Sequence, residues 1–178
     1  MTTTYQSRGL IRVHTGKGKG KTTAALGCAF CALSRGEKVF VIQFLKGRET
    51  GESLAAQWLA PNLSFRQFGR IGFVHAKTPA PLDLTLVQEA WALAKEVILA
   101  GEHDLVILDE VIRAMAHGFI SLSEVMDTLR LRPPGVGVIL TGRQAPQELI
   151  DQADIVTEMH PVKHYYKAGV CARKGIEW

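Results

Sequence analysis

The sequence has no long apolar run, few cysteines and few aromatic residues. No stretch of about eighteen consecutive apolar residues occurs, which excludes a transmembrane helix on sequence grounds. The polar segment from Met1 to Gly9 lacks the apolar core of a signal peptide, so we expect a cytoplasmic protein. Aromatic residues make up only 7% of the chain and basic residues form no long stripe, which disfavours nucleic acid as a partner.

The three cysteines are odd in number and too few for a disulfide framework. Cys28 and Cys31 form a C-x-x-C pair, a spacing that also occurs in redox and zinc sites. The pair lies in an alanine-rich stretch of helical character, and no second Cys or His pair follows at metal-ligand spacing. We therefore interpret both cysteines as small buried residues of a helix.

What the chain does have is an ordinary globular composition with a local excess of positive charge. Its 178 residues, 47% of them hydrophobic, fit one domain, 1–178, with a short N-terminal tail at 1–9. The formal net charge is +4, and three lysines fall within five residues, Lys17, Lys19 and Lys21. Such a cluster suits a small polyanionic ligand.

Apolar segments of strand and helix character alternate along the chain. We expect strands at 10–14, 38–44, 63–68, 104–109, 136–140 and 155–158, and helices at 21–33, 82–100, 122–131 and 146–153. This alternation predicts an α/β fold whose mostly parallel sheet carries helices on both faces. In such folds ligands bind at the carboxyl ends of the strands.

A glycine-lysine loop joins the first expected strand to the first expected helix, which is the context of a P-loop. Lys21 supplies a mobile positive charge and the Thr22 hydroxyl is placed to bind Mg²⁺ (or Mn²⁺). The standard motif has four residues between its glycines; here there are three, and Thr15 stands at the usual first-glycine position. The residues expected to bind the nucleotide are Gly16, Lys17, Gly18, Lys19, Gly20, Lys21, Thr22 and Thr23.

The apolar segment LVILDE ends in two acids, Asp109 and Glu110. In P-loop proteins we expect such a strand beside the first strand, with an acid facing the metal directly or through water. Neighbouring residues of a strand point in opposite directions, so one acid can face the metal while the other orients a neighbour. Arg143 follows another strand end, where a phosphate contact and a surface salt bridge are equally good interpretations.

These residues predict a Mg-ATP-dependent P-loop protein, and a family resemblance goes further. The segments TGKGKGKTTAALG, VFVIQFLKG, LVILDE, ILTGR and PVKHYYKAGVCARKGIEW resemble the ATP:corrinoid adenosyltransferases of cobalamin synthesis over about residues 9–178. The resemblance implies a RecA-like homodimer that binds ATP in reverse along a shortened loop. It also implies that Co(I) of a corrinoid attacks the ribose C5′ and that tripolyphosphate leaves. Lys21 and Lys19 would stabilise that leaving group, with Mg²⁺ held by Thr22 and Glu110 and supported by Asp109.

The resemblance also assigns roles to a loop after the third strand. The family uses two aromatic residues there to displace the lower ligand of cobalt; Phe73 matches the first, and His75 stands where the second is Trp. After the first glycine of the loop the family usually carries Asn or a similar residue, whereas this chain has Lys17. The corrinoid would be cobyrinic acid a,c-diamide, cobinamide or cobalamin, and a flavoprotein is a candidate reductant. The alternatives are a RecA-like ATPase or kinase, and a non-catalytic, nucleotide-gated corrinoid carrier.

Overall fold

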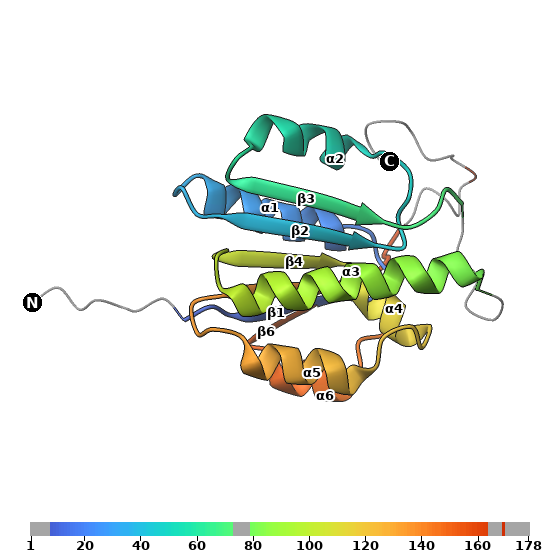
Figure 1. Cartoon of the computed structure of the whole chain (residues 1–178). Helices are drawn as coiled ribbons and strands as arrows, with labels where there is room; N and C mark the ends of the chain where they lie inside the picture. Colours follow the sequence, from blue (N-terminus) through green and yellow to red (C-terminus); the bar gives the residue numbers. More distant parts are fainter. Residues whose placement is uncertain (1–7, 73–78, 164–168, 170–178) are drawn as a thin grey trace, which may run out of the picture.

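The computed structural model describes residues 8–72, 79–163 and 169, in which strands and helices alternate as predicted (Figure 1). The strands are β1 (Ile11–Thr15), β2 (Val39–Phe44), β3 (Leu63–Phe68), β4 (Leu105–Asp109), β5 (Gly137–Thr141) and β6 (Ile155–Glu158). The helices are α1 (Lys21–Leu33), α2 (Gly51–Ala56), η1 (Gln57–Leu59, a 3-10 turn), α3 (Pro81–Ala100), α4 (Val111–Ala116), α5 (Leu122–Leu131) and α6 (Gln147–Gln152).

The strands form one six-stranded parallel sheet in the order β3-β2-β4-β5-β1-β6. The predicted parallel α/β fold is confirmed. However, the expectation that the strand ending in Asp109 lies beside the first strand is wrong, because β5 pairs with both β1 and β4. Two strand spacings of roughly 4.8 Å therefore separate β4 from β1, and the end of β5 lies between the acid and the loop.

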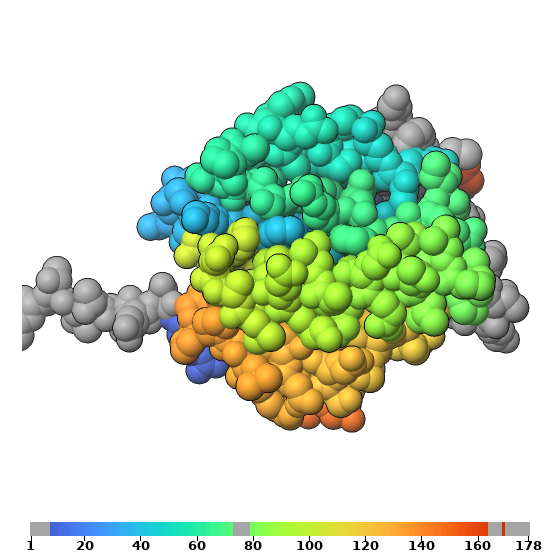
Figure 2. Space-filling view, in the orientation of Figure 1, coloured from blue at the N-terminus to red at the C-terminus, as the bar shows by residue number. Residues whose placement is uncertain are grey.

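Helices cover both faces of the sheet, as predicted, and alternate strand residues serve the two faces. In β4, Val106 and Leu108 join the core formed with α3, α4, α5 and α6, whereas Ile107 joins the core formed with α1 and α2. Figure 2 shows α3 and α5 side by side over the first face, and the two helices are in contact. Burial of both faces explains why the central strands are almost continuously apolar.

Two short helices and one burial assignment differ from the expectations. The helices α2 and α4, six residues each, have too few turns to give an apolar pattern in the sequence. Cys31 is exposed and Cys28 half-buried, so the prediction that both are buried is wrong: α1 packs on the sheet through its alanines and leaves this side open. No helix in the described ranges is long and apolar enough to cross a membrane.

Two residues of the expected tail contact the sheet end. Arg8 Nη2 donates to Asp154 Oδ1 over 2.9 Å, and the Gly9 amide donates to the Pro134 carbonyl over 2.7 Å. These contacts lie at the amino ends of the strands. The glycine loop lies at the opposite, carboxyl edge of the sheet, where the strand-helix-strand topology places ligands.

Candidate active site

The loop between β1 and α1 packs against the segment that follows β6. Gly16 and Gly20 have φ angles of 96° and 112°, in the left-handed region open to glycine. The Gly18 amide donates to the Met159 carbonyl over 2.7 Å. A Cβ added to Gly16 or Gly18 would lie 2.4 Å or 2.7 Å from that carbonyl oxygen. The loop therefore requires glycine where its backbone meets Met159.

Lys21 is buried within the curve of this loop. Its Nζ donates to the carbonyl oxygens of Gly16 (2.9 Å) and Gly18 (2.6 Å), and only 8% of the residue is exposed. Burial lowers the pKa of Lys21, as does the charge of Arg143, while Glu110 and Asp109 oppose the shift. The ammonium thus stabilises the loop through two hydrogen bonds, and it lies where the loop would enclose phosphate oxygens.

The other predicted nucleotide-binding residues surround this centre. Thr22 is half-buried at the start of α1, while Lys17, Lys19 and Thr23 are exposed. Arg143 is also exposed, and it follows β5 close enough for its charge to act on Lys21. The structure thus gathers the predicted nucleotide-binding residues at the carboxyl edge of the sheet, where Gly16, Gly18 and Lys21 are buried.

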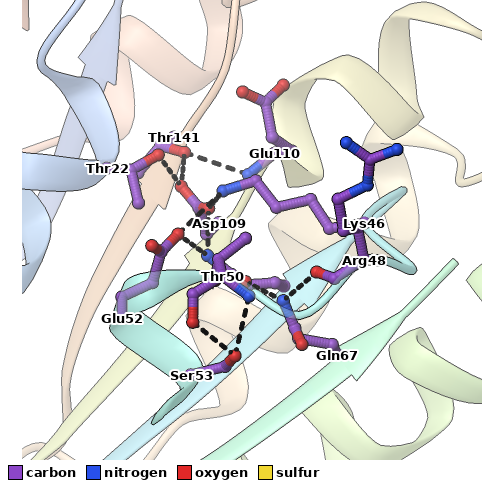
Figure 3. Close-up of polar contacts among 11 residues, drawn as sticks. Thr22, Lys46, Arg48, Thr50, Glu52, Ser53, Gln67, Asp109, Glu110 and Thr141 are labelled. Carbon is purple, nitrogen blue, oxygen red and sulfur yellow. Dashed lines mark hydrogen bonds and ion pairs between the residues drawn. The ribbon is translucent and has the colours of Figure 1, made fainter. Parts of the chain in front are cut away.

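Asp109 is the centre of a polar network between four elements (Figure 3). Its carboxylate is buried, and each oxygen accepts two hydrogen bonds. Oδ1 accepts from the hydroxyls of Thr22 (2.8 Å) and Thr141 (2.6 Å). Oδ2 accepts from Gln43 Nε2 (3.0 Å) and from Lys46 Nζ (2.8 Å). Both oxygens of the Asp109 carboxylate therefore already accept as many hydrogen bonds from the protein as they have lone pairs.

Glu110 is placed differently from its neighbour. Its φ of 63° turns the chain directly from β4 into α4, and its amide donates to Thr141 Oγ1 over 2.9 Å. In Figure 3 its carboxylate points away from the network around Asp109. Burial raises the pKa of Glu110, and the negative charge of Asp109 raises it further, against the opposing charges of Lys46, Arg113 and Lys21. A cation bound beside Glu110 would favour its charged carboxylate and so oppose the rise in its pKa.

The donor set fits a magnesium ion that is shared with a nucleotide. The Thr22 hydroxyl and the Glu110 carboxylate are hard oxygen ligands, and Mg²⁺ commonly takes one or two protein oxygens together with phosphates and water. Among the described residues, no group of three or more His, Cys, Asp or Glu side chains gathers as a self-sufficient metal site. Cys28 and Cys31 belong to no such group among the described residues.

Comparison with known proteins gives the family. Residues 7–178 match the family described as ATP:corrinoid adenosyltransferase BtuR/CobO/CobP. The chain belongs to this family. Three relatives carry matching names: corrinoid adenosyltransferases of Pseudomonas aeruginosa and Escherichia coli K12, and the corrinoid adenosyltransferase CobA of Salmonella typhimurium. They are 38%, 39% and 38% identical, over 96%, 96% and 97% of this chain and 84%, 86% and 87% of their own lengths.

Two regions that the resemblance to the adenosyltransferases assigns lie outside the described residues. Phe73 and His75 belong to residues 73–78, and most of the C-terminal segment PVKHYYKAGVCARKGIEW belongs to residues 164–168 and 170–178. Their assigned roles stay predictions. Only 161–163 and Gly169 of this segment are described, and Met159, whose carbonyl supports the phosphate loop, lies just before it.

Sequence reasoning missed the side chains that surround Asp109 within this adenosyltransferase. Gln43 also donates to Glu52 (3.2 Å) and accepts from Gln67 (2.8 Å), and Lys46 Nζ lies 3.6 Å from Glu52 Oε1. Two signals were available: Gln43 is a polar residue inside an apolar strand, and Lys46 follows the carboxyl end of that strand. The decisive fact, the β2–β4 pairing that sets Gln43 opposite Asp109, is tertiary.

Proposed function

We propose that this protein transfers the 5′-deoxyadenosyl group of ATP to the Co(I) centre of a corrinoid, with tripolyphosphate as the leaving group. The observation that carries the proposal is the family match across residues 7–178, which takes in the phosphate loop, the Asp109 network and the tail. The geometry of the loop supports the ATP half of the proposal, and the family supports the corrinoid half.

The proposed reaction balances without a proton transfer from the nucleophile. An electron pair on Co(I) forms the Co–C5′ bond, the C5′–O5′ bond breaks, and its electron pair leaves on the triphosphate. The work of the protein is to align C5′ with cobalt and to stabilise the growing charge on the leaving group. Lys21 would contact that charge, with Lys17, Lys19, Thr23 and Arg143 as further groups around the phosphates; the burial of the Lys21 ammonium within the loop supports this role.

Thr22 and Glu110 would hold the Mg²⁺, with Asp109 orienting Thr22. A divalent ion bound there supplies positive charge to the triphosphate. Two observations support assigning the metal to Glu110 and the orienting role to Asp109. Both oxygens of Asp109 already accept protein hydrogen bonds, while the Glu110 carboxylate points away from that network (Figure 3). The Thr22 hydroxyl donates a hydrogen bond to Asp109, so its oxygen lone pairs are left for a cation.

The finer parts of the proposal concern the second substrate and the assembly. Phe73 and His75 would face the lower side of the corrin, the physiological corrinoid would be cobyrinic acid a,c-diamide, cobinamide or cobalamin, and a flavoprotein would deliver the electron. The protein would act in the cytoplasm as a homodimer. Light scattering on purified protein tests the last point, with a mass near twice the 19.5 kDa of one chain as the expected result.

The test is product analysis in the presence of Mg-ATP, each of the three corrinoids in turn, and a chemical reductant. We expect a light-sensitive adenosylated corrinoid and an equal amount of tripolyphosphate, and neither product without reductant. ADP without a Co–C bond would contradict the proposal in favour of an ATPase or kinase. Unchanged ATP together with tight corrinoid binding would contradict it in favour of a carrier.

A further inference from the structure

The contact between Lys46 and Asp109 differs from an ordinary surface salt bridge. Lys46 Nζ lies 2.8 Å from Asp109 Oδ2, and the two side chains are 26% and 1% exposed. Exposed ion pairs contribute little, but a charged hydrogen bond to a buried carboxylate is among the stronger polar contacts in proteins. The pair lies at the carboxyl edge of the sheet, next to the phosphate loop.

The two carboxylate oxygens of Asp109 accept hydrogen bonds from different parts of the fold. Thr22 of α1 and Thr141 of β5 donate to Oδ1, whereas Lys46 and Gln43, from β2 and the turn after it, donate to Oδ2. A carboxylate is planar, so a donor that fixes one oxygen also fixes the direction of the other. Lys46 therefore acts on the orientation of the Thr22 hydroxyl through a carboxylate that both side chains contact.

The backbone places Lys46 firmly enough for this role. Leu45 has a φ of 59°, which turns the chain sharply after β2, and the Lys46 amide donates to the Phe68 carbonyl over 3.2 Å. The chain after β2 touches the chain after β3 so closely that a Cβ on Gly47 would lie 2.2 Å from the Gly69 carbonyl oxygen. These contacts fix the base of the Lys46 side chain against the neighbouring strand.

The ammonium group of Lys46 contacts Asp109, whereas that of Lys21 contacts backbone carbonyls. The Lys21 ammonium is committed to two loop carbonyls, whereas Lys46 Nζ has acids on two sides, Asp109 and, at 3.6 Å, Glu52. We propose that Lys46 is a positioning residue of the nucleotide site, which holds Asp109 so that the Thr22 hydroxyl stays directed for Mg-ATP binding. This inference rests on the Mg-ATP part of the proposed function.

A double-mutant cycle tests the inference, with the dissociation constant of Mg-ATP measured by calorimetry in the absence of corrinoid. Lys46→Met and Thr22→Val are each expected to weaken binding about tenfold. In the Thr22→Val background, Lys46→Met is expected to change the constant less than about twofold, because the hydroxyl it positions is gone. Lys46→Arg, which keeps the charge, should bind within about threefold of the parent.

Controls separate this role from a merely structural one. Lys38→Met removes an exposed lysine at the other end of β2 and should leave Mg-ATP binding unchanged, and urea unfolding reports the stability of every variant. A Lys46→Met protein that is less stable but binds Mg-ATP like the parent would overturn the inference. Equal losses in both backgrounds would also overturn it, since Lys46 would then act without Thr22.

The cycle remains decisive in two further cases. If Lys46→Met does not fold, Lys46→Gln, which keeps a donor without the charge, replaces it in the same cycle with the same expected non-additivity. Adenosyl transfer plays no part in the measurement. A protein that shows the coupling but forms no Co–C bond therefore keeps this inference and loses the proposed function, whereas a parent protein that binds no Mg-ATP loses both.

Discussion

The two edges of the parallel sheet use polar residues in opposite ways. At the carboxyl edge, Asp109 is buried and joins side chains from α1, β2 and β5 within one network. At the amino edge the contacts are more exposed and mostly involve the backbone: Asp154 accepts from the Ile11 amide and from Arg8, whose side chain is 68% exposed, and Arg132 donates to backbone carbonyls. Convergence of buried polar groups therefore distinguishes the candidate site.

Concavity alone does not make that distinction. The amino edge has a hollow of about 530 Å³, lined in part by Arg12, Cys28, Cys31 and Asp104. Within the described chain, its cysteines belong to no metal-binding cluster, and the carboxylate of Asp104 serves the Lys38 amide as a strand-end contact. We interpret the polar groups of this edge as contributions to the stability of the fold.

The largest expected difference between the edges is in the reaction rate. Lys21→Ala removes the ammonium from the phosphate loop and should slow adenosyl transfer about 30- to 1,000-fold, or about 2–4 kcal/mol of transition-state stabilisation. Lys38→Ala, at the amino edge, should leave the rate unchanged. Steady-state assays of both variants decide the matter, and a Lys21→Ala enzyme with nearly full activity would show that Lys21 does not contact the leaving group.

Asparagine substitutions compare the stability contributions of the two edges. Asp109→Asn replaces a buried acceptor of four hydrogen bonds by a group that can satisfy only part of them, and should cost about 2–4 kcal/mol in the free energy of unfolding. Asp154→Asn weakens an exposed pair with Arg8 and should cost less than about 1 kcal/mol. Urea titrations measure both, and equal losses would remove the distinction between the edges.

The histidines predict a smaller, pH-dependent effect at both edges. Burial lowers the pKa of His14, at the carboxyl edge, and of His103, at the amino edge, from the ordinary value of 6.5. Below that pH the unfolded chain binds more protons than the folded one, so stability falls as the pH falls. His14→Gln should flatten the decline between about pH 7 and pH 5 more than His103→Gln, because His14 is the more buried.

Chemical denaturation at several pH values tests this prediction. A decline that is as steep in His14→Gln as in the parent would show that the buried ring does not carry the effect. The hydrogen bond between His14 Nδ1 and the Lys21 carbonyl, 3.3 Å long, acts in the opposite direction and limits the shift.

The smallest effect is expected at the C-x-x-C pair. Cys31→Ser changes an exposed residue of α1 and should alter the free energy of unfolding by less than about 0.5 kcal/mol, with no change in rate. Denaturation and activity measurements on the variant are sufficient. A large loss of activity would show that the amino edge takes part in the reaction after all.

Much of the fold was predictable because the strands and the longer helices each carry their own signal in the sequence. The central strands are apolar throughout, α1 begins at the glycine loop, and its predicted bounds, 21–33, are the observed ones. The short helices α2 and α4 lack such a signal. The order of the strands lacks one too, because β5 lies between β1 and β4 through long-range pairing that no local pattern encodes.

The candidate site was predictable only where it follows a contiguous motif. The loop residues and the pair Asp109 and Glu110 could be identified from spacing and strand context. Gln43 and Lys46 could not, because their role depends on the register that sets Gln43 opposite Asp109 and on the turn at Leu45. The support that Met159 gives the loop was hidden for the same reason, since more than a hundred residues separate them in sequence.

The most direct test of the central claim is a single-turnover reaction with ATP that carries ¹³C at the ribose C5′. With Mg²⁺, a reduced corrinoid and this protein, we predict that the ¹³C resonance moves to that of a cobalt-bound carbon while ³¹P spectra show intact tripolyphosphate. Label that remains on a nucleotide, with ADP and phosphate or a phosphorylated acceptor as the products, would contradict the account.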